Sequence, residues 1–140
     1  EIERSDFQLL TEKIQHVDLD LFKDADILFI DSSHVSKFNS DVNMEIFQII
    51  PKLKKGAYIH WHDIMIPNDY PEYWIKDGNK FWNENYLVHA FMLFNESFEV
   101  LWPSRFMQDY HPEIVKEFFE EFDANNLDDQ LSSFWVRRIK

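Results

Sequence analysis

The chain of 140 residues contains no cysteine. This absence excludes disulfide bonds, thiolate metal sites and a cysteine nucleophile. It leaves the redox compartment open, and a reducing cytoplasm is the location we expect. Glycine is scarce as well, with only Gly56 and Gly78, and the sequence begins with Glu1 rather than methionine. We therefore expect a piece of a longer protein.

Positive charge and long apolar runs are also in short supply. The chain has 14 lysine and arginine residues against 26 aspartate and glutamate residues, a formal net charge of -12. Such a charge repels nucleic-acid phosphates and anionic lipid headgroups. No apolar run approaches the roughly 20 residues needed to span a bilayer. We expect a soluble protein that binds neither nucleic acid nor a membrane.

The sequence does contain two apolar runs that end in acidic and imidazole side chains. Residues 27–30 lead into Asp31-Ser32-Ser33-His34, and residues 57–61 lead into His62-Asp63. Buried parallel strands of an α/β sheet deliver polar groups at their carboxyl ends, where the ligand crevice lies. We therefore expect both segments to contribute to one shared site.

The residues between these runs predict a strand–helix–strand crossover with parallel pairing. Ser40-Asp41 is a helix cap before an apolar stripe, and Pro51 would kink or end that helix. Periodicity predicts the other elements as well. The expected strands are 14–19, 27–31, 57–62, 98–102 and 134–139, with helices over 82–95 and 112–122 and an aromatic loop over 64–79.

Taken together, these segments resemble the C-terminal half of a class I S-adenosylmethionine-dependent methyltransferase. The likeness is to methyltransferase family 24 and related metal-dependent sugar O-methyltransferases. The pieces that carry it are residues 27–34, Ser40-Asp41-Val42-Asn43, residues 59–63, residues 67–74, Trp82-Asn83-Glu84 with Tyr86, and Ala90-Phe91 with Asn95.

The resemblance implies an α/β fold with a Rossmann-like sheet, mostly parallel with an antiparallel last strand. Residues 14–19 would supply the third strand of that sheet, and the other four predicted strands would be the fourth to seventh. The family's glycine-rich loop and its ribose-binding acidic residue are not found here. Residues 1–140 are therefore expected to form a single partial methyltransferase domain that lacks the cofactor-binding N-terminal half.

The resemblance also implies a metal-assisted site. Asp31, His62 and Asp63 match the positions at which metal-dependent relatives hold Mg²⁺, which orients a substrate diol and lowers a hydroxyl pKa. The nitrogen of His62 would favour a softer ion such as Mn²⁺, Fe²⁺ or Zn²⁺. The alternative is that no metal binds, with Asp31 capping a turn and His62 bonded to a neighbour.

His34 matches the histidine proposed as general base in related sugar methyltransferases, with Asp31 beside it as a second catalytic residue. An unperturbed pKa near 6.5 suits a histidine to accept a hydroxyl proton. The alternative is a loop histidine that caps a helix or meets solvent. From the pattern alone, His60 is expected to be a satisfied core histidine, and Asp41 a plain N-cap.

Cofactor and substrate contacts follow from the same resemblance. Gln15, His16 and Asp31 are the expected contacts of S-adenosylmethionine. Tyr70 and Trp74 would stack on a sugar ring, or alternatively anchor their own loop by burial.

The function we expect is O-methyl transfer from S-adenosylmethionine to a hydroxyl of a sugar or another small metabolite, assisted by Mg²⁺ or Mn²⁺. We do not expect these residues alone to be active. Two alternatives stay open: a non-catalytic binding module derived from a methyltransferase, and an Fe(II)-dependent hydroxylase using His34, His62 and one carboxylate. A sheet without its first two strands has an unpaired edge, so we expect a homo-oligomer.

Overall fold

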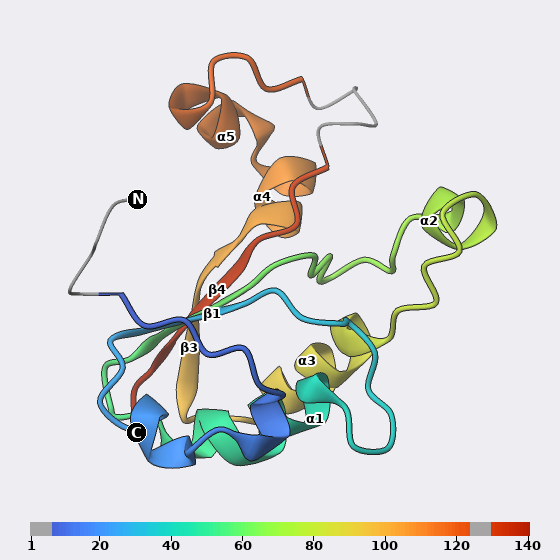
Figure 1. The fold of residues 1–140 in the computed structure, drawn as a ribbon. Helices are drawn as coiled ribbons and strands as arrows, with labels where there is room; N and C mark the ends of the chain where they lie inside the picture. Colours follow the sequence, from blue (N-terminus) through green and yellow to red (C-terminus); the bar gives the residue numbers. More distant parts are fainter. Residues whose placement is uncertain (1–6, 124–129) are drawn as a thin grey trace.

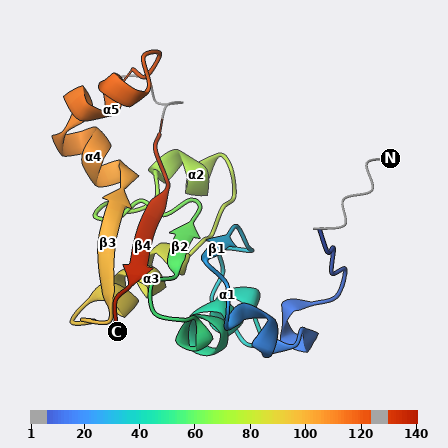
Figure 2. The same cartoon turned by 90° about the vertical axis from the view of Figure 1, so that its left-hand side faces the viewer.

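The computed structural model describes residues 7–123 and 130–140, which form one four-stranded sheet with helices around it (Figure 1). The strands are β1 (Ile27–Ile30), β2 (Tyr58–Trp61), β3 (Phe98–Pro103) and β4 (Phe134–Arg138). Their order in the sheet is β1-β2-β4-β3, which Figure 2 shows from right to left. All four lie where the sequence predicted strands, and the mixed α/β class is confirmed.

The strand directions place both predicted polar segments at the same end of the sheet. β1 and β2 are parallel, with Ile30 opposite Trp61. β4 is antiparallel to both β2 and β3, so the last strand alone runs against the other three, as predicted. Because Ile30 and Trp61 are paired, the residues that follow them leave the sheet side by side.

The strand predicted over residues 14–19 is wrong. The segment forms two short 3₁₀-helices, Ile14–His16 and Leu19–Phe22. The N–H groups of His16 and Val17 bond locally to the carbonyls of Lys13 and Ile14. β1 pairs only with β2 in the described part of the chain, and none of the four strands pairs with residues 14–19. Local hydrogen bonds then satisfy the backbone instead.

The predicted crossover helix is present, but it changes its winding twice. It begins as α1 (Asp41–Met44), widens to a π-helical turn (Glu45–Ile49) and tightens to a 3₁₀ turn (Ile50–Lys52) that contains Pro51. Ser40 is the N-cap, since its hydroxyl accepts the N–H of Asn43 at 3.3 Å. The apolar stripe of this helix packs in the core with Ile30, Ile59 and Trp61.

The remaining helices are α2 (Glu72–Lys76), α3 (Glu84–Met92), α4 (Ser104–Tyr110) and α5 (Pro112–Phe118). α3 lies inside the predicted helix over 82–95. α5 starts at Pro112 as predicted but ends at Phe118 rather than residue 122, because Val115 is its one buried residue and the following phenylalanines have no core to enter. α2 and α4 were not predicted.

The two faces of the sheet differ. α1 and α3 lie on one side of the strands in Figure 1, and Figure 2 looks onto the other side, where no helix of the described chain crosses in front of the strands. On that open side Ile27 and Phe29 are each 59% exposed. No helix among the described residues is long and apolar enough to cross a membrane.

Candidate active site

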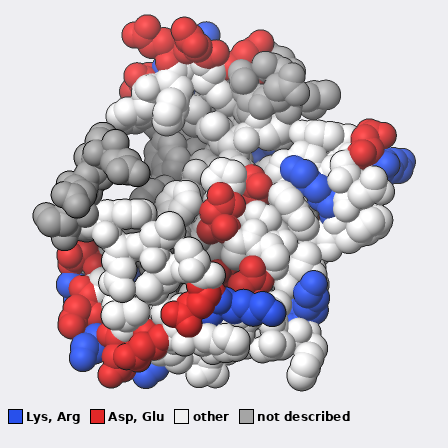
Figure 3. Space-filling view, viewed as in Figure 1, with Lys and Arg blue, Asp and Glu red and all other residues white. Residues whose placement is uncertain are grey.

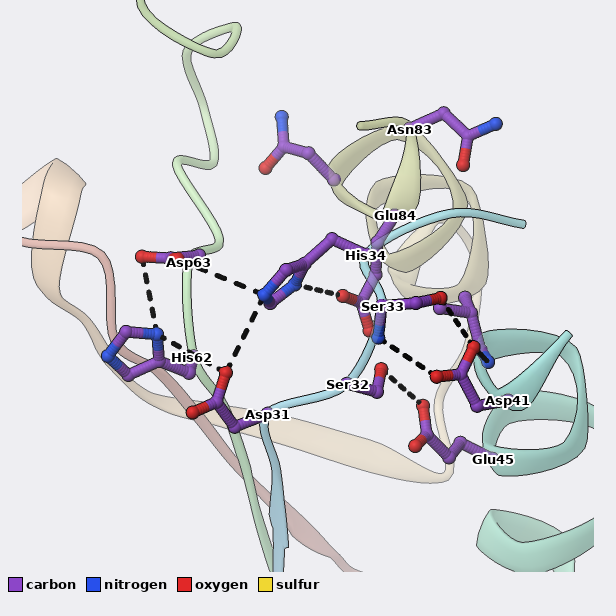
Figure 4. A network of polar contacts seen from close by, with 12 residues as sticks. Asp31, Ser32, Ser33, His34, Asp41, Glu45, His62, Asp63, Asn83 and Glu84 are labelled. Atoms are coloured by element: carbon purple, nitrogen blue, oxygen red, sulfur yellow. Dashed lines mark hydrogen bonds and ion pairs between the residues drawn. The ribbon is translucent and has the colours of Figure 1, made fainter. Parts of the chain in front are cut away.

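Four residues singled out from the sequence meet at the carboxyl ends of β1 and β2 (Figure 4). His34 Nε2 lies 3.6 Å from Asp31 Oδ1 and 3.9 Å from Asp63 Oδ2. His62 Nδ1 lies 3.3 Å from Asp63 Oδ1 and 3.8 Å from Asp31 Oδ1. The expectation that both strand ends contribute to one cluster is confirmed, while the roles of the individual residues remain predictions.

The backbone of His34 is held by the start of α3. His34 adopts the left-handed backbone region, with φ of 57°. This conformation costs a non-glycine residue about 1 to 3 kcal/mol unless the surroundings impose it. Its carbonyl accepts the N–H groups of Asn83 and Glu84, at 3.0 and 3.1 Å. The helix terminus therefore gains acceptors for two of its free N–H groups while it fixes the loop.

The ring of His34 is held by the same helix. His34 Nδ1 and Glu84 Oε2 form a hydrogen bond of 2.8 Å. The side chain of Glu84 is fully buried, and its second oxygen has no hydrogen-bond partner among the described residues. The ring of Trp82 covers His34, with the two ring centroids 4.2 Å apart. His34 is thus a buried imidazole with one nitrogen engaged and the other facing two carboxylates.

The charges around His34 raise its pKa above the ordinary 6.5. Burial alone lowers the pKa, because it disfavours the imidazolium. The hydrogen bond and charge of Glu84, with the charges of Asp63 and Asp31, outweigh burial. The result is a histidine that accepts a proton more readily than a free imidazole does, as a general base requires.

The two carboxylates differ in how much solvent they meet. The side chain of Asp31 is 54% exposed and that of Asp63 only 16% exposed. Asp63 also lies in the left-handed backbone region, and its Oδ1 accepts the hydroxyl of Ser132 at 2.9 Å. The segment that leads into β4 therefore helps to fix Asp63, while Asp31 stays open to a ligand.

The predicted metal ligands come together without forming a preorganised metal centre. Within residues 7–123 and 130–140, no group of three or more histidine, aspartate and glutamate side chains is arranged to hold a metal ion. One feature does suit a cation: His62 Nδ1 is a buried nitrogen without a hydrogen-bond partner in the described chain, although Asp63 lies close to it. As they lie, the three residues do not fit an ion, and metal binding stays a prediction.

A cavity of about 520 Å³, lined mostly by residues with polar side chains, lies beside this cluster, and Asp31 belongs to both. Gln15 lines the cavity and donates its side-chain N–H to the carbonyl of Asn39 at 2.9 Å. His16, which was also predicted to contact S-adenosylmethionine, is exposed and is not part of the lining. The remaining lining residues are Lys13, Ile14, Ser32, Ser33, Lys37, Asn39, Ser40, Asp41 and Glu45.

Asp41 is not the N-cap that the sequence suggested, because Ser40 has that role. Asp41 instead holds the loop after β1, since its carboxylate accepts the N–H of Ser33 at 2.9 Å and also the Ser33 hydroxyl. Burial alone raises the pKa of Asp41, but the bonds from Ser33 and from its own helix turn lower it overall. Asp41 thus shapes the wall of the cavity.

Glu45 is a second carboxyl on this wall that the sequence did not single out. It accepts the hydroxyl of Ser32 at 3.0 Å and is almost fully buried. Burial, together with the charge of Glu84, raises the pKa of Glu45 to about 7. The carboxyl group therefore carries a proton in much of the neutral pH range, which reduces repulsion between buried acids.

Tyr70 and Trp74, the predicted substrate contacts, form an aromatic cluster with Trp82. Trp74 lies 5.2 Å from Trp82 between ring centroids, and Lys80 Nζ sits 4.2 Å from the Trp74 ring centroid. Tyr70 is buried, and its hydroxyl accepts the N–H of Asn85 at 3.1 Å. Tyr70 therefore anchors the loop from beneath, and Trp74 is the more accessible ring.

His60 is buried as expected, but hydrogen bonds do not satisfy it. Its ring lies between Phe29 and Trp135, at centroid distances of 4.5 and 4.6 Å. Its Nδ1 has no partner in the described chain. Burial and the neighbouring His62 lower the pKa of His60, so the ring is neutral. Stacking rather than hydrogen bonding accounts for its position.

Comparison with known proteins adds one finding. Residues 4–64 match the model of a family described as a methyltransferase domain. The match supports a methyltransferase-family domain. The matched residues include the cavity residue Gln15 and the cluster of Asp31, His34, His62 and Asp63. They end at Ile64, the first residue of the aromatic loop, and do not reach α3. No curated protein and no solved structure gives a significant match.

Sequence reasoning assigned no role to Glu84 or Asn83, although both lie in the Trp82-Asn83-Glu84 segment that carried part of the resemblance. Asn83 accepts the N–H of Ser36 at 2.6 Å, and Glu84 bonds His34 across a separation of 50 residues. An acidic residue in the first turn of a helix is common because the helix dipole favours it. The sequence pattern around Glu84 is explained by this local effect, so it gives no sign of the contact with His34, which depends on the fold.

Proposed function

We propose that this domain takes part in S-adenosylmethionine-dependent O-methyl transfer to a hydroxyl of a sugar or another small hydroxylated metabolite. The observation that supports the proposal is His34: a buried imidazole whose Nε2 faces Asp31 and Asp63 at the end of two parallel strands. The match to a methyltransferase domain over residues 4–64 agrees with this assignment.

His34 is the general base in this proposal. The acceptor hydroxyl lies near Nε2, its oxygen forms a bond to the methyl carbon, and its proton moves to Nε2. S-adenosylmethionine, if bound beside Asp31, would supply an electrophilic methyl group. The bond from that methyl to sulfur would break as the acceptor oxygen bonds to it, and the electron pair would stay on sulfur. The imidazolium that results is stabilised by the carboxylates of Asp31, Asp63 and Glu84 around it.

The cavity beside Asp31 is the proposed place for the cofactor. Its amide, hydroxyl and carboxylate groups suit the hydroxyl and amino groups of S-adenosylmethionine, with Gln15 and Asp31 as contacts. His16 lies outside the cavity, so it could contact the cofactor only from its exposed position next to Gln15. Asp31 lies between the cavity and His34. A methyl group held in this cavity would therefore be close to an acceptor hydroxyl that is hydrogen-bonded to His34 Nε2.

Trp74 is the proposed stacking surface for a sugar ring, because it lies next to Trp82, which covers His34. Tyr70 supports this ring from below through its contact at 5.7 Å. A sugar on Trp74 would present its hydroxyl groups toward the base. Metal assistance is a separable part of the proposal. Asp31, His62 and Asp63 would have to move to hold Mg²⁺ or Mn²⁺, and a bound ion would orient the acceptor hydroxyl and lower its pKa.

The deciding experiment is calorimetric titration of S-adenosylmethionine into the longest natural chain that contains this sequence, with a methyl-transfer assay on a panel of sugars. His34→Ala should retain cofactor binding and lose methyl transfer by about 10² to 10⁴-fold, the usual contribution of a general base. The matched control is His89→Ala, an exposed histidine on α3 away from the cluster. It should leave both properties unchanged.

The same experiment separates the alternatives. Full methyl transfer by His34→Ala would overturn the assignment of the base. Absence of cofactor binding in the wild-type protein would remove the enzyme proposal and leave a binding module. A separate titration of Mg²⁺ or Mn²⁺ into wild type and Asp63→Ala tests the metal, and no heat of binding in either protein would remove that part alone.

A further inference from the structure

Glu84 stands out as a buried carboxylate that the fold has no evident reason to keep. Its side chain is 0% exposed, it bonds to His34, and its Oε1 has no hydrogen-bond partner among the described residues. Burial of a carboxylate is costly unless it is well paired, and a buried apolar residue of similar size is often as stable or more so. A purely structural position would thus favour a neutral side chain.

The contact between the two side chains restricts which nitrogen of His34 carries the proton. An ionised carboxylate only accepts hydrogen bonds, so Glu84 Oε2 at 2.8 Å requires a proton on Nδ1. A neutral imidazole has one proton, so Nε2 is then left with a free lone pair. Nε2 is also the nitrogen that lies near the carboxylates of Asp31 and Asp63.

Asp31 and Asp63 act in the opposite sense to Glu84. Their carboxylates lie 3.6 and 3.9 Å from Nε2, beyond hydrogen-bond distance but close enough for their charge to favour a proton on that nitrogen. A proton on Nε2 would block the lone pair that must accept the hydroxyl proton. The carboxylate of Glu84 is closer to the ring than either aspartate, so its charge makes Nδ1 the preferred position of the proton.

The ring also cannot easily turn over. His34 is 5% exposed, Trp82 packs on one side of the ring, and the N–H groups of Asn83 and Glu84 hold the His34 carbonyl. Glu84 therefore contacts both the backbone and the side chain of His34 from one helix turn. This double contact fixes the position of the imidazole relative to the end of the sheet.

We propose that Glu84 is a positioning residue that holds the His34 imidazole with its proton on Nδ1 and its free Nε2 lone pair toward Asp31 and Asp63. The inference deepens the proposed function, because the tautomer matters for catalysis only if His34 is the base. The ring geometry itself does not depend on that function. The tautomer can therefore be tested without an activity assay.

The test is ¹⁵N NMR of the histidine rings in the longest natural chain, at a pH above the titration of His34, with the His34 signals assigned by their loss in His34→Ala. In the wild type, Nδ1 should have the shift of a protonated nitrogen and Nε2 that of an unprotonated one. Glu84→Gln keeps the size of the side chain and removes its charge, so the proton should move largely to Nε2. Glu117→Gln, the same change at an exposed carboxyl on α5, should leave the tautomer unchanged.

The outcomes are distinct. A wild-type ring protonated on Nε2 would overturn the inference even if Glu84→Gln did not fold, and an unchanged tautomer in Glu84→Gln would overturn it as well. If the tautomer shifts as expected, kcat for methyl transfer should fall about 10² to 10⁴-fold with KM for the acceptor little changed. A shifted tautomer with no methyl transfer in any variant, wild type included, would leave the role of Glu84 standing and count against the proposed function instead.

Discussion

The acidic side chains at the site divide into an exposed and a buried set. Asp31 meets solvent and borders the cavity, so it is available to a ligand. Glu45 and Glu84 are buried and act on their neighbours, Ser32 and His34. The exposed carboxylate is therefore suited to binding, and the buried ones to positioning and to the local charge balance.

Glu45 should make the stability of the domain depend on pH. The pKa of this carboxyl group is raised from 4.5 to about 7 in the folded protein. The folded state therefore binds the proton more tightly than the unfolded state. The contribution of this group to stability is most favourable below a pH of about 4.5. It falls as the pH rises to about 7 and is constant above that. The two pKa values bound the loss at about 3 kcal/mol.

Glu45→Gln should remove this dependence, because the amide keeps an acceptor for Ser32 and carries no charge. We expect the free energy of unfolding at a pH of about 8 to rise by about 1 to 3 kcal/mol. Urea denaturation between pH values of about 5 and 8 measures it. The exposed Glu117→Gln is the matched control and should leave the wild-type profile intact. A Glu45→Gln profile as steep as the wild type would contradict the prediction.

At the scale of elements, the start of α3 organises both sides of the site. Asn83 and Glu84 hold the loop after β1 through the His34 carbonyl. The next residue, Asn85, holds the loop after β2: its side chain accepts the N–H of Met65 at 2.8 Å and donates to the carbonyl of Asn68 at 2.9 Å. One helix terminus thus fixes two loops that are far apart in the sequence.

Asn85→Ala should therefore destabilise the domain more than an ordinary polar substitution. It leaves the buried N–H of Met65 and the carbonyl of Asn68 without their partner, at a cost of about 2 to 4 kcal/mol in unfolding free energy. Thermal or urea unfolding measures the change. Gln48→Ala, at an exposed amide on the crossover helix, should stay within about 0.5 kcal/mol of the wild type. Equal effects of the two substitutions would refute the role of Asn85.

For the whole molecule, the notable features are an acidic surface and an open sheet face. Figure 3 shows acidic side chains in groups over the N-terminal segment and over α5, with the lysines and arginines scattered among them. β1 is an edge strand of the sheet, because in the described chain it pairs on one side only, and its exposed side chains Ile27 and Phe29 lie on the open face. An unpaired strand with apolar side chains is a surface on which a second copy of the chain can pack.

We propose that the protein forms a homo-oligomer through this face, with Phe29 in the contact. Phe29→Lys places a charge on the open face and should shift the protein toward the monomer in light scattering. Phe94→Lys is the matched control, since Phe94 is fully exposed at a turn away from this face and should not change the mass. A wild-type protein that is monomeric at micromolar concentration would contradict the proposal.

The sequence by itself determined the four strands of the sheet and the polar ends of β1 and β2. Alternating and continuous apolar runs specify strands because their side chains must be buried, and Asp31, His34, His62 and Asp63 follow directly from where those runs stop. The cap at Ser40 and the start of α5 at Pro112 are local features of the same kind. The winding of the crossover helix before and at Pro51 was predictable only in part, because the π turn depends on packing.

Tertiary structure alone decided the contacts that join distant segments. Residues 14–19 have a strand-like pattern, but they do not join the free edge of β1, and their backbone forms local hydrogen bonds instead. In the sequence, Glu84 is an acidic residue in the first turn of a predicted helix. It forms a hydrogen bond with His34 only because the start of α3 lies against the loop after β1. Burial, charge and the proton position on an imidazole depend on groups that meet in space. These properties therefore follow from the fold and not from the order of residues.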